Sequence, residues 1–191
     1  IKLKMTSLVF PGQGSQFTGM SKDFYDNFSA ARDIFEIVSD TTKIDLRDII
    51  FNNPSNYLNQ TQFTQISIFC SSMSIFNVLK KEIGLDNLNI DYMLGHSLGE
   101  YSALSAAGIL SIENCSQLLK IRGELMQNAY EPNKSGMAAI IGLNCATVEN
   151  IINQNNLDIE IANDNSPMQV VVSGILENLK GTDKFFMEKG A

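Results

Sequence analysis

The sequence has little that would mark a nucleic-acid-binding, secreted or membrane protein. Its 14 basic residues are outnumbered by 21 acidic ones, giving a net charge of −7, whereas nucleic acids and anionic membranes select for clustered basic side chains. Three widely spaced cysteines, without a CxxC or Cys/His pairing, indicate neither a disulfide framework nor a zinc site. No apolar run approaches the roughly 18 residues of a membrane span, and the start carries no secretory signal. We expect a protein of the cytosol, or of an organelle matrix, with no metal.

The overall composition is typical of a folded protein with two domains. The chain has 191 residues, of which 44% are hydrophobic and 18% charged, enough for one core and a small satellite domain. The composition changes around Pro132, where residues 130–135 have no apolar period. We therefore predict a large domain over residues 1–132 and a small one over 133–191.

Two short strands of the large domain each end in a glycine-containing loop. Residues 7–10 form an apolar run that ends at Pro11 and enters the loop 12–16, and residues 91–95 predict a second strand that leads into His96. In a parallel sheet both loops open at the same carboxyl edge, where ligands bind.

Amphipathic spacing predicts helices between and after these strands. Apolar residues recur every three or four positions over 23–39 and 63–79, and a run of small residues over 102–108 suits a helix lying close to a sheet. Ser111 is a candidate cap for a further helix that carries Arg122. For that helix we predict an inner face of Leu118, Ile121, Leu125 and Ala129.

The small domain has its own order of elements. The pattern predicts a strand at 136–143, a helix at 146–154, strands at 158–162 and 169–173 around a turn at 163–167, and a helix at 176–188. This β-α-β-β-α order lacks only a final strand of a ferredoxin-like fold. The fold class is therefore α/β, with a parallel sheet in the large domain and an incomplete ferredoxin-like small domain.

One motif predicts nucleophilic chemistry. The run Gly95-His96-Ser97-Leu98-Gly99 fits the nucleophile elbow, in which a serine sits on a sharp strand-to-helix turn with its hydroxyl exposed. The N–H of Leu98, at the start of the helix, is placed to donate to an acyl oxyanion. The loop around Gln13 opens at the same edge and could complete the oxyanion hole, although a solvated loop glutamine fits the sequence equally well.

Two further side chains near this motif need an assignment. Arg122 lies beside apolar Ile121 on its helix, so it is either a surface arginine or an inward-facing anion clamp, and the spacing does not decide between them. His96 is the only histidine. Adjacent residues at a strand end project to opposite faces, so we expect its ring to point away from the Ser97 hydroxyl and to pack rather than act as base.

These motifs, taken together, resemble the malonyl-CoA:acyl carrier protein transacylase family. Four blocks, in order and spanning nearly the whole chain, carry the resemblance: residues 10–16, residues 95–104, Arg122-Gly123 with Met126-Gln127, and residues 161–167. The resemblance implies an α/β-hydrolase-like large domain interrupted by the ferredoxin-like small domain.

The resemblance also implies a reaction and a role for each site residue. Ser97 would take a malonyl group from malonyl-CoA as an ester and pass it to the phosphopantetheine thiol of acyl carrier protein, supplying fatty acid synthesis. Leu98 and Gln13 would donate to the oxyanion, and Arg122 would bind the malonyl carboxylate. No cofactor is expected, because malonyl-CoA is itself a substrate. Acyl carrier proteins are acidic, so this acidic chain would dock through a local basic patch.

The general base is the one part of the site that the sequence does not contain. In the family it is a histidine that follows the small domain, and this chain reaches Ala191 without it. We therefore expect transfer by these 191 residues alone to be severely impaired. The alternatives are a polyketide-type acyltransferase, a plain α/β-hydrolase esterase, which Arg122 and the Gln13 loop disfavour, and a non-catalytic binding protein of the same fold.

Overall fold

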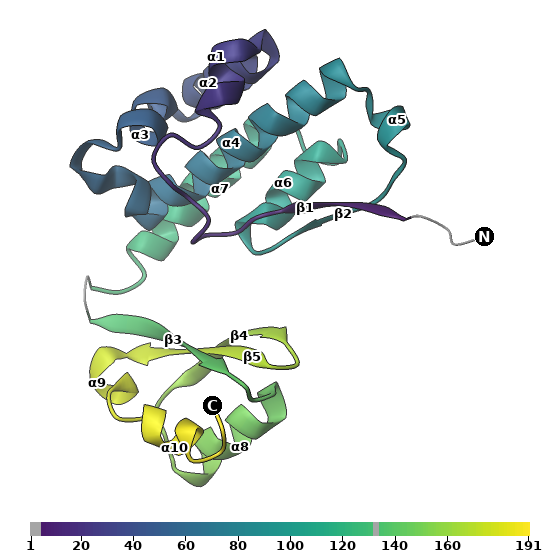
Figure 1. The fold of residues 1–191 in the computed structure, drawn as a ribbon. Coiled ribbons are helices and arrows are strands. Elements are labelled where there is room, and N and C mark those ends of the chain that lie inside the picture. The colour runs from purple at the N-terminus through teal and green to yellow at the C-terminus, as the bar shows by residue number, and fades with distance from the viewer. Residues whose placement is uncertain (1–4, 132–133) are drawn as a thin grey trace. The chain divides into compact units, whose positions relative to one another are not determined.

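The computed structural model describes residues 5–131 and 134–191, which form two compact units, Ile1–Asn128 and Ala129–Ala191 (Figure 1). The unit boundary lies four residues before the predicted one, and Pro132 itself is outside the described residues. Unit 1 holds a parallel sheet and unit 2 an antiparallel one, so the mixed α/β class is confirmed.

The parallel sheet of unit 1 consists of β1 (Thr6–Phe10) and β2 (Ile90–Gly95), in agreement with both predicted strands. The register pairs Phe10 with Gly95, the last residue of each strand. The loop after β1 and the turn after β2 therefore leave the sheet side by side, as the sequence predicts.

Helices supply most of the unit 1 core. The longest, α4 (Thr61–Glu82), packs against α2 and α7, and Figure 1 shows α4 and α7 running side by side. Its buried side chains include Phe69 and Met73. The other helical segments of unit 1 are α1 (Lys22–Asn27), α2 (Ser29–Thr42), α3 (Leu46–Asn52), η1 (Pro54–Asn59), α5 (Leu85–Leu88), α6 (Leu98–Ala106) and α7 (Ile112–Gln127).

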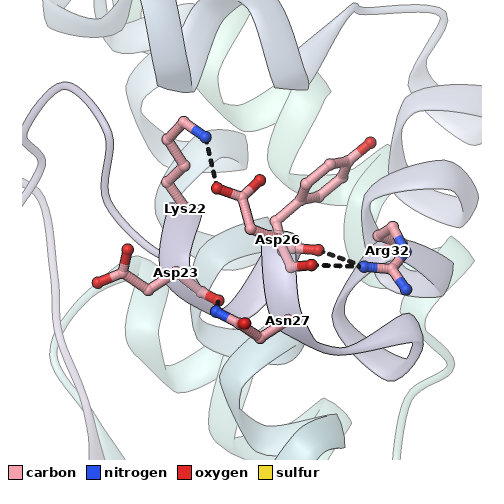
Figure 2. Close-up of polar contacts among 6 residues, drawn as sticks. Lys22, Asp23, Asp26, Asn27 and Arg32 are labelled. Atoms are coloured by element: carbon pink, nitrogen blue, oxygen red, sulfur yellow. Dashed lines mark hydrogen bonds and ion pairs between the residues drawn. The ribbon is translucent and has the colours of Figure 1, made fainter.

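The predicted continuous helix over 23–39 is wrong, because the chain breaks at Phe28. This residue is extended, with φ −126° and ψ 125°. Arg32 of α2 donates from Nη1 to the carbonyl of Tyr25 at 2.7 Å and to that of Asp26 at 3.2 Å. Figure 2 shows Arg32 reaching back to Asp26 at the end of α1. Cationic donors at the last carbonyls of a helix stabilise the helix end. The spacing of apolar residues does not reveal such a contact, so it did not predict the break.

The helix α7 begins as predicted but buries a different face. Ser111 Oγ accepts a hydrogen bond from the N–H of Asn114 at 3.1 Å, so the predicted cap is confirmed. The predicted inner residues Leu118, Ile121 and Leu125 are instead 45%, 54% and 68% exposed, and Ala129 lies beyond the helix.

Small residues form the true inner face of α7. The buried positions are Cys115, Ser116, Leu119 and Gly123. A Cβ on Gly123 would come within 3.0 Å of the Thr61 carbonyl oxygen and of the Gln62 Cα on α4. The two helices therefore approach too closely for a row of large side chains, and this contact selects small ones.

Unit 2 places a three-stranded antiparallel sheet, in the order β3-β5-β4, against short helices. Its small core includes Val148, Val170, Val172 and Phe186. The elements are β3 (Ser135–Ile141), α8 (Cys145–Gln154), β4 (Glu160–Ser166), β5 (Gln169–Ile175), α9 (Leu176–Leu179) and α10 (Asp183–Met187).

Two predictions in unit 2 are wrong in detail. The predicted turn at 163–167 is mostly strand, because β4 continues to Ser166, which pairs with Gln169 across a tighter turn. The predicted last helix is interrupted between α9 and α10, where Gly181 adopts a φ of +78° that ends a helix. Across the described ranges 5–131 and 134–191, none of the helices has the length and apolar character needed to cross a bilayer.

Candidate active site

Ser97 occupies a strained turn between β2 and α6. Its φ of 55° and ψ of −112° are rare for a residue with a side chain, and such strain is common at catalytic turns. Ser97 is also exposed and immediately precedes the first residue of α6. The motif Gly-x-Ser-x-Gly thus lies in the strand-turn-helix context that a nucleophile elbow requires.

The two glycines of the motif let the elbow pack against β1. A Cβ on Gly95 would lie 1.9 Å from the carbonyl carbon of Gly99, and a Cβ on Gly99 would lie 2.3 Å from the carbonyl oxygen of Phe10. Both obstacles are backbone atoms, so no side-chain movement could relieve them. Glycine is therefore needed at both positions for α6 to begin where it does.

The loop after β1 lies directly against this elbow. A Cβ on Gly12 would lie 2.6 Å from Nδ1 of His96 and 2.7 Å from its carbonyl oxygen, and the N–H of His96 donates to the Phe10 carbonyl at 3.2 Å. The imidazole therefore lies beside Gly12 of the loop, but His96 is exposed rather than buried. Gln13, the next loop residue, is exposed and donates through Nε2 to Oγ1 of Thr61 at 3.2 Å.

Arg122 lies beside the Ser97 hydroxyl. Its Nη2 donates to Ser97 Oγ at 2.9 Å, although the two residues are 25 positions apart in the sequence. The side chain is half-buried, and its guanidinium carbon lies 5.9 Å from the centre of the Tyr101 ring. Of the two arrangements left open by the sequence, the inward-facing one is observed.

Gln65 belongs to the same network and was missed by the sequence analysis. Its side chain is fully buried, its Oε1 accepts a short hydrogen bond from Nη1 of Arg122, and its Nε2 donates to Sδ of Met126 at 3.1 Å. Gln65 lies four residues before Phe69 and eight before Met73, both in the core. A glutamine in that apolar stripe was the available signal for a buried polar contact.

The start of α6 adds electrostatic stabilisation beside Ser97. Leu98 is the first residue of the helix and its side chain is fully buried. The first N–H groups of a helix have no intrahelical acceptor, and the helix dipole is positive at this end. A nucleophilic hydroxyl, a helix start and a cationic side chain thus meet at one turn, which suits acyl transfer to serine with recognition of an anionic acyl group.

Other nucleophiles and ligands are less suited to such chemistry. Burial raises the pKa of the Cys70 and Cys115 thiols, so neither offers a thiolate near neutral pH. Within the part of the chain that the structure describes, no three His, Cys, Asp or Glu side chains are grouped to hold a metal ion.

Comparison with known proteins agrees with this geometry. Residues 7–183 match the acyl transferase domain family. The chain belongs to the acyl transferase domain family. One similar member is a malonyl CoA-acyl carrier protein transacylase from Staphylococcus aureus strain MRSA252, which is 38% identical over 175 residues. The matched residues cover 90% of this chain and 55% of that relative.

Two further relatives extend the comparison. A polyketide biosynthesis malonyl CoA-acyl carrier protein transacylase from Bacillus velezensis is 39% identical over 95% of this chain and 60% of its own length. The crystal structure of the malonyl CoA-acyl carrier protein transacylase from Clostridium perfringens superimposes with a TM-score of 0.88 at 36% identity, covering 98% of this chain and 58% of that one. The acyl transferase chain described here therefore spans between one half and two thirds of the length of these relatives.

Proposed function

We propose that this chain carries the nucleophile and the acyl-recognition group of a malonyl-CoA:acyl carrier protein transacylase. The observation that carries the proposal is the 2.9 Å hydrogen bond between Arg122 Nη2 and Ser97 Oγ. It joins a hydroxyl on a nucleophile elbow to a cation that suits the free carboxylate of a malonyl group. The names of the relatives support the same activity.

In the first half-reaction Ser97 Oγ attacks the thioester carbonyl of malonyl-CoA. A bond forms between Oγ and the carbonyl carbon, and the bond from that carbon to the coenzyme A sulfur breaks. The hydroxyl proton passes through a general base to the departing sulfur. By resemblance this base is a histidine from the portion of the relatives that follows the small domain. The backbone N–H groups of Leu98 and Gln13 stabilise the oxyanion.

In the second half-reaction the phosphopantetheine thiol of acyl carrier protein attacks the malonyl-serine ester. The malonyl group leaves on that sulfur and the proton returns to Ser97 Oγ, so the enzyme is regenerated by a ping-pong mechanism. The exchange of one thioester for another is redox-neutral, and we propose no resident cofactor. A similar structure, 33% identical to this chain, is a malonyl-transacylase in complex with a type II polyketide synthase acyl-carrier protein, which supports an acyl carrier protein as partner.

Arg122 provides the selectivity for malonyl groups. A planar guanidinium offers paired donors to a carboxylate, and a hydrogen bond to a charged group contributes about 1.5–3 kcal/mol. An acetyl group has no carboxylate to offer, so it would leave the half-buried cation without an anionic partner. Discrimination against acetyl-CoA follows from that unmet interaction.

The finer description of the fold supports the same assignment. We propose that unit 1 is an α/β-hydrolase-like domain, because it presents a nucleophile elbow at the carboxyl edge of a parallel sheet. We propose that unit 2 is a partial ferredoxin-like domain, because the order β3-β5-β4 places β5 between two strands that are joined through α8.

The relative from Bacillus velezensis favours a second candidate, in which the same chemistry supplies a polyketide pathway. The two candidates differ in the carrier protein rather than in the acyl group. Their discrimination therefore rests on which acyl carrier protein accepts the malonyl group.

A transfer assay tests the proposal directly. The chain would be extended to the length of its relatives and incubated with radiolabelled malonyl-CoA and either a fatty acid or a polyketide acyl carrier protein. We expect label on one carrier protein, parallel double-reciprocal plots, and loss of transfer with Ser97→Ala. In Arg122→Ala the preference for malonyl-CoA over acetyl-CoA would fall by about 10- to 100-fold. Transfer that survives Ser97→Ala would contradict the proposal.

A further inference from the structure

We propose that Gln65 is a positioning residue that aims the Arg122 guanidinium at the acyl site and thereby sets the preference for acyl groups that carry a carboxylate. The inference rests on the proposed function, because it assumes malonyl transfer by Ser97. The contacts that support it are those of the Gln65 side chain with Arg122 and Met126. Gln65 touches neither Ser97 nor, by this account, the substrate, and it acts through Arg122.

Gln65 connects α4 to two successive turns of α7. Its Oε1 accepts from Arg122 and its Nε2 donates to the sulfur of Met126, four residues further along the helix. Each end of the amide therefore has its own partner, and the side chain is fully buried. Because the two ends are chemically different, the amide oxygen is held on the Arg122 side.

The close approach of the two helices makes this contact stiff. Gly123, next to Arg122, lets α7 come so near α4 that a Cβ there would be 3.0 Å from the Gln62 Cα. Arginine is a long side chain with several rotatable bonds, and free it would sample many directions. With Nη1 held by Gln65 and Nη2 directed at Ser97 Oγ, the guanidinium has one orientation.

The chemistry of an amide suits this role better than that of a carboxylate. A glutamine oxygen orients the guanidinium while leaving the positive charge of Arg122 uncompensated. A glutamate at the same place would form an ion pair and compete with the malonyl carboxylate for the cation. The network therefore holds the arginine ready for an anion from the substrate.

Two substitutions and one matched control separate positioning from folding. Gln65→Met keeps the length of the side chain and removes both amide contacts, whereas Gln65→Glu keeps an acceptor and adds a charge. Gln117→Met, at an exposed position of α7, is the control. All would be assayed in a chain extended to the length of the relatives, with malonyl-CoA and acetyl-CoA as donors, and their thermal unfolding recorded.

We expect Gln65→Met to raise KM for malonyl-CoA by about tenfold or more with kcat changed much less, because the carboxylate contact is made in both ground and transition states. The preference for malonyl-CoA over acetyl-CoA should fall by the same factor. Gln65→Glu should also raise KM for malonyl-CoA, and the loss should diminish at acidic pH as the glutamate is protonated. Kinetics of Gln65→Met equal to those of Gln117→Met would overturn the proposal.

A spectroscopic measurement tests the same contact without any reaction. In nitrogen-15 spectra of the 191-residue chain, a held guanidinium gives separate Nη resonances, whereas a freely rotating one gives an averaged signal. We expect separate Arg122 signals in the parent chain and in Gln117→Met, and an averaged signal in Gln65→Met. If no chain transfers malonyl groups, the proposed function fails, and these spectra alone decide on Gln65. Separate signals that persist in Gln65→Met would overturn it.

Discussion

Replacing Gly99 by alanine should damage both stability and catalysis, because the new methyl group meets backbone rather than side chains. The Cβ would lie 2.3 Å from the Phe10 carbonyl oxygen and 2.8 Å from that of Pro11. To reach ordinary van der Waals contact, α6 would have to move from β1 by about 1 Å. Overpacking of this kind typically costs about 1–3 kcal/mol, and a displacement of about 1 Å at a reacting group can reduce the rate about 100-fold.

The assay compares Gly99→Ala with Glu100→Ala, the same residue introduced one position later on the exposed side of α6. Urea unfolding gives the loss of stability, and the rate of Ser97 acylation by malonyl-CoA, in a chain extended to the length of the relatives, gives the loss of function. We expect Glu100→Ala to change stability by less than about 1 kcal/mol. If the two variants unfold at the same urea concentration and acylate at the same rate, the close approach of α6 to β1 is not what the elbow requires.

Substitutions at three further positions test other parts of the structure. Ser111→Ala should destabilise unit 1 by about 1 kcal/mol through loss of the α7 cap, measured by urea unfolding, and Ser111→Asp should restore most of that loss. Arg32→Met should lower the melting temperature and speed amide exchange in α1, because it leaves the carbonyls of Tyr25 and Asp26 without their donor. Unchanged exchange would contradict the capping role of Arg32. Burial raises the pKa of the Cys70 thiol, so the folded state keeps its proton while the unfolded chain ionises above about pH 8.5. The free energy of unfolding should therefore fall as pH rises past that value, by up to about 1.4 kcal/mol per pH unit. Cys70→Ala should remove this contribution to the pH dependence of the unfolding free energy. An identical pH dependence in both proteins would refute the role of Cys70.

The features that local sequence determines were predictable. The elbow at Ser97 was predictable because the Gly-x-Ser-x-Gly pattern stands between a predicted strand and a run suited to a helix, which is the context that the motif requires. The common edge of the Gln13 loop and the elbow was predicted on the premise of a parallel sheet, and β1 and β2 do pair in parallel. The cap at Ser111 was likewise readable from residues only three apart.

The features that depend on how distant helices meet were not predictable. The inner face of α7 was misassigned because the contact with α4 selects small residues such as Gly123, whereas periodicity favours the largest apolar ones. For the same reason the direction of Arg122 stayed open, and Gln65 was overlooked, since its partner lies 57 positions away. The break at Phe28 depends in a similar way on Arg32 reaching back to α1.

The most direct test of the account is the intact mass of the protein after brief incubation with malonyl-CoA. The chain extended to the length of its relatives should gain the mass of one malonyl group, located on Ser97 by peptide mapping and absent in Ser97→Ala. A malonyl adduct that persists in Ser97→Ala, or no adduct on the extended chain at any malonyl-CoA concentration, would contradict the central claim that Ser97 is the nucleophile of a malonyl transferase.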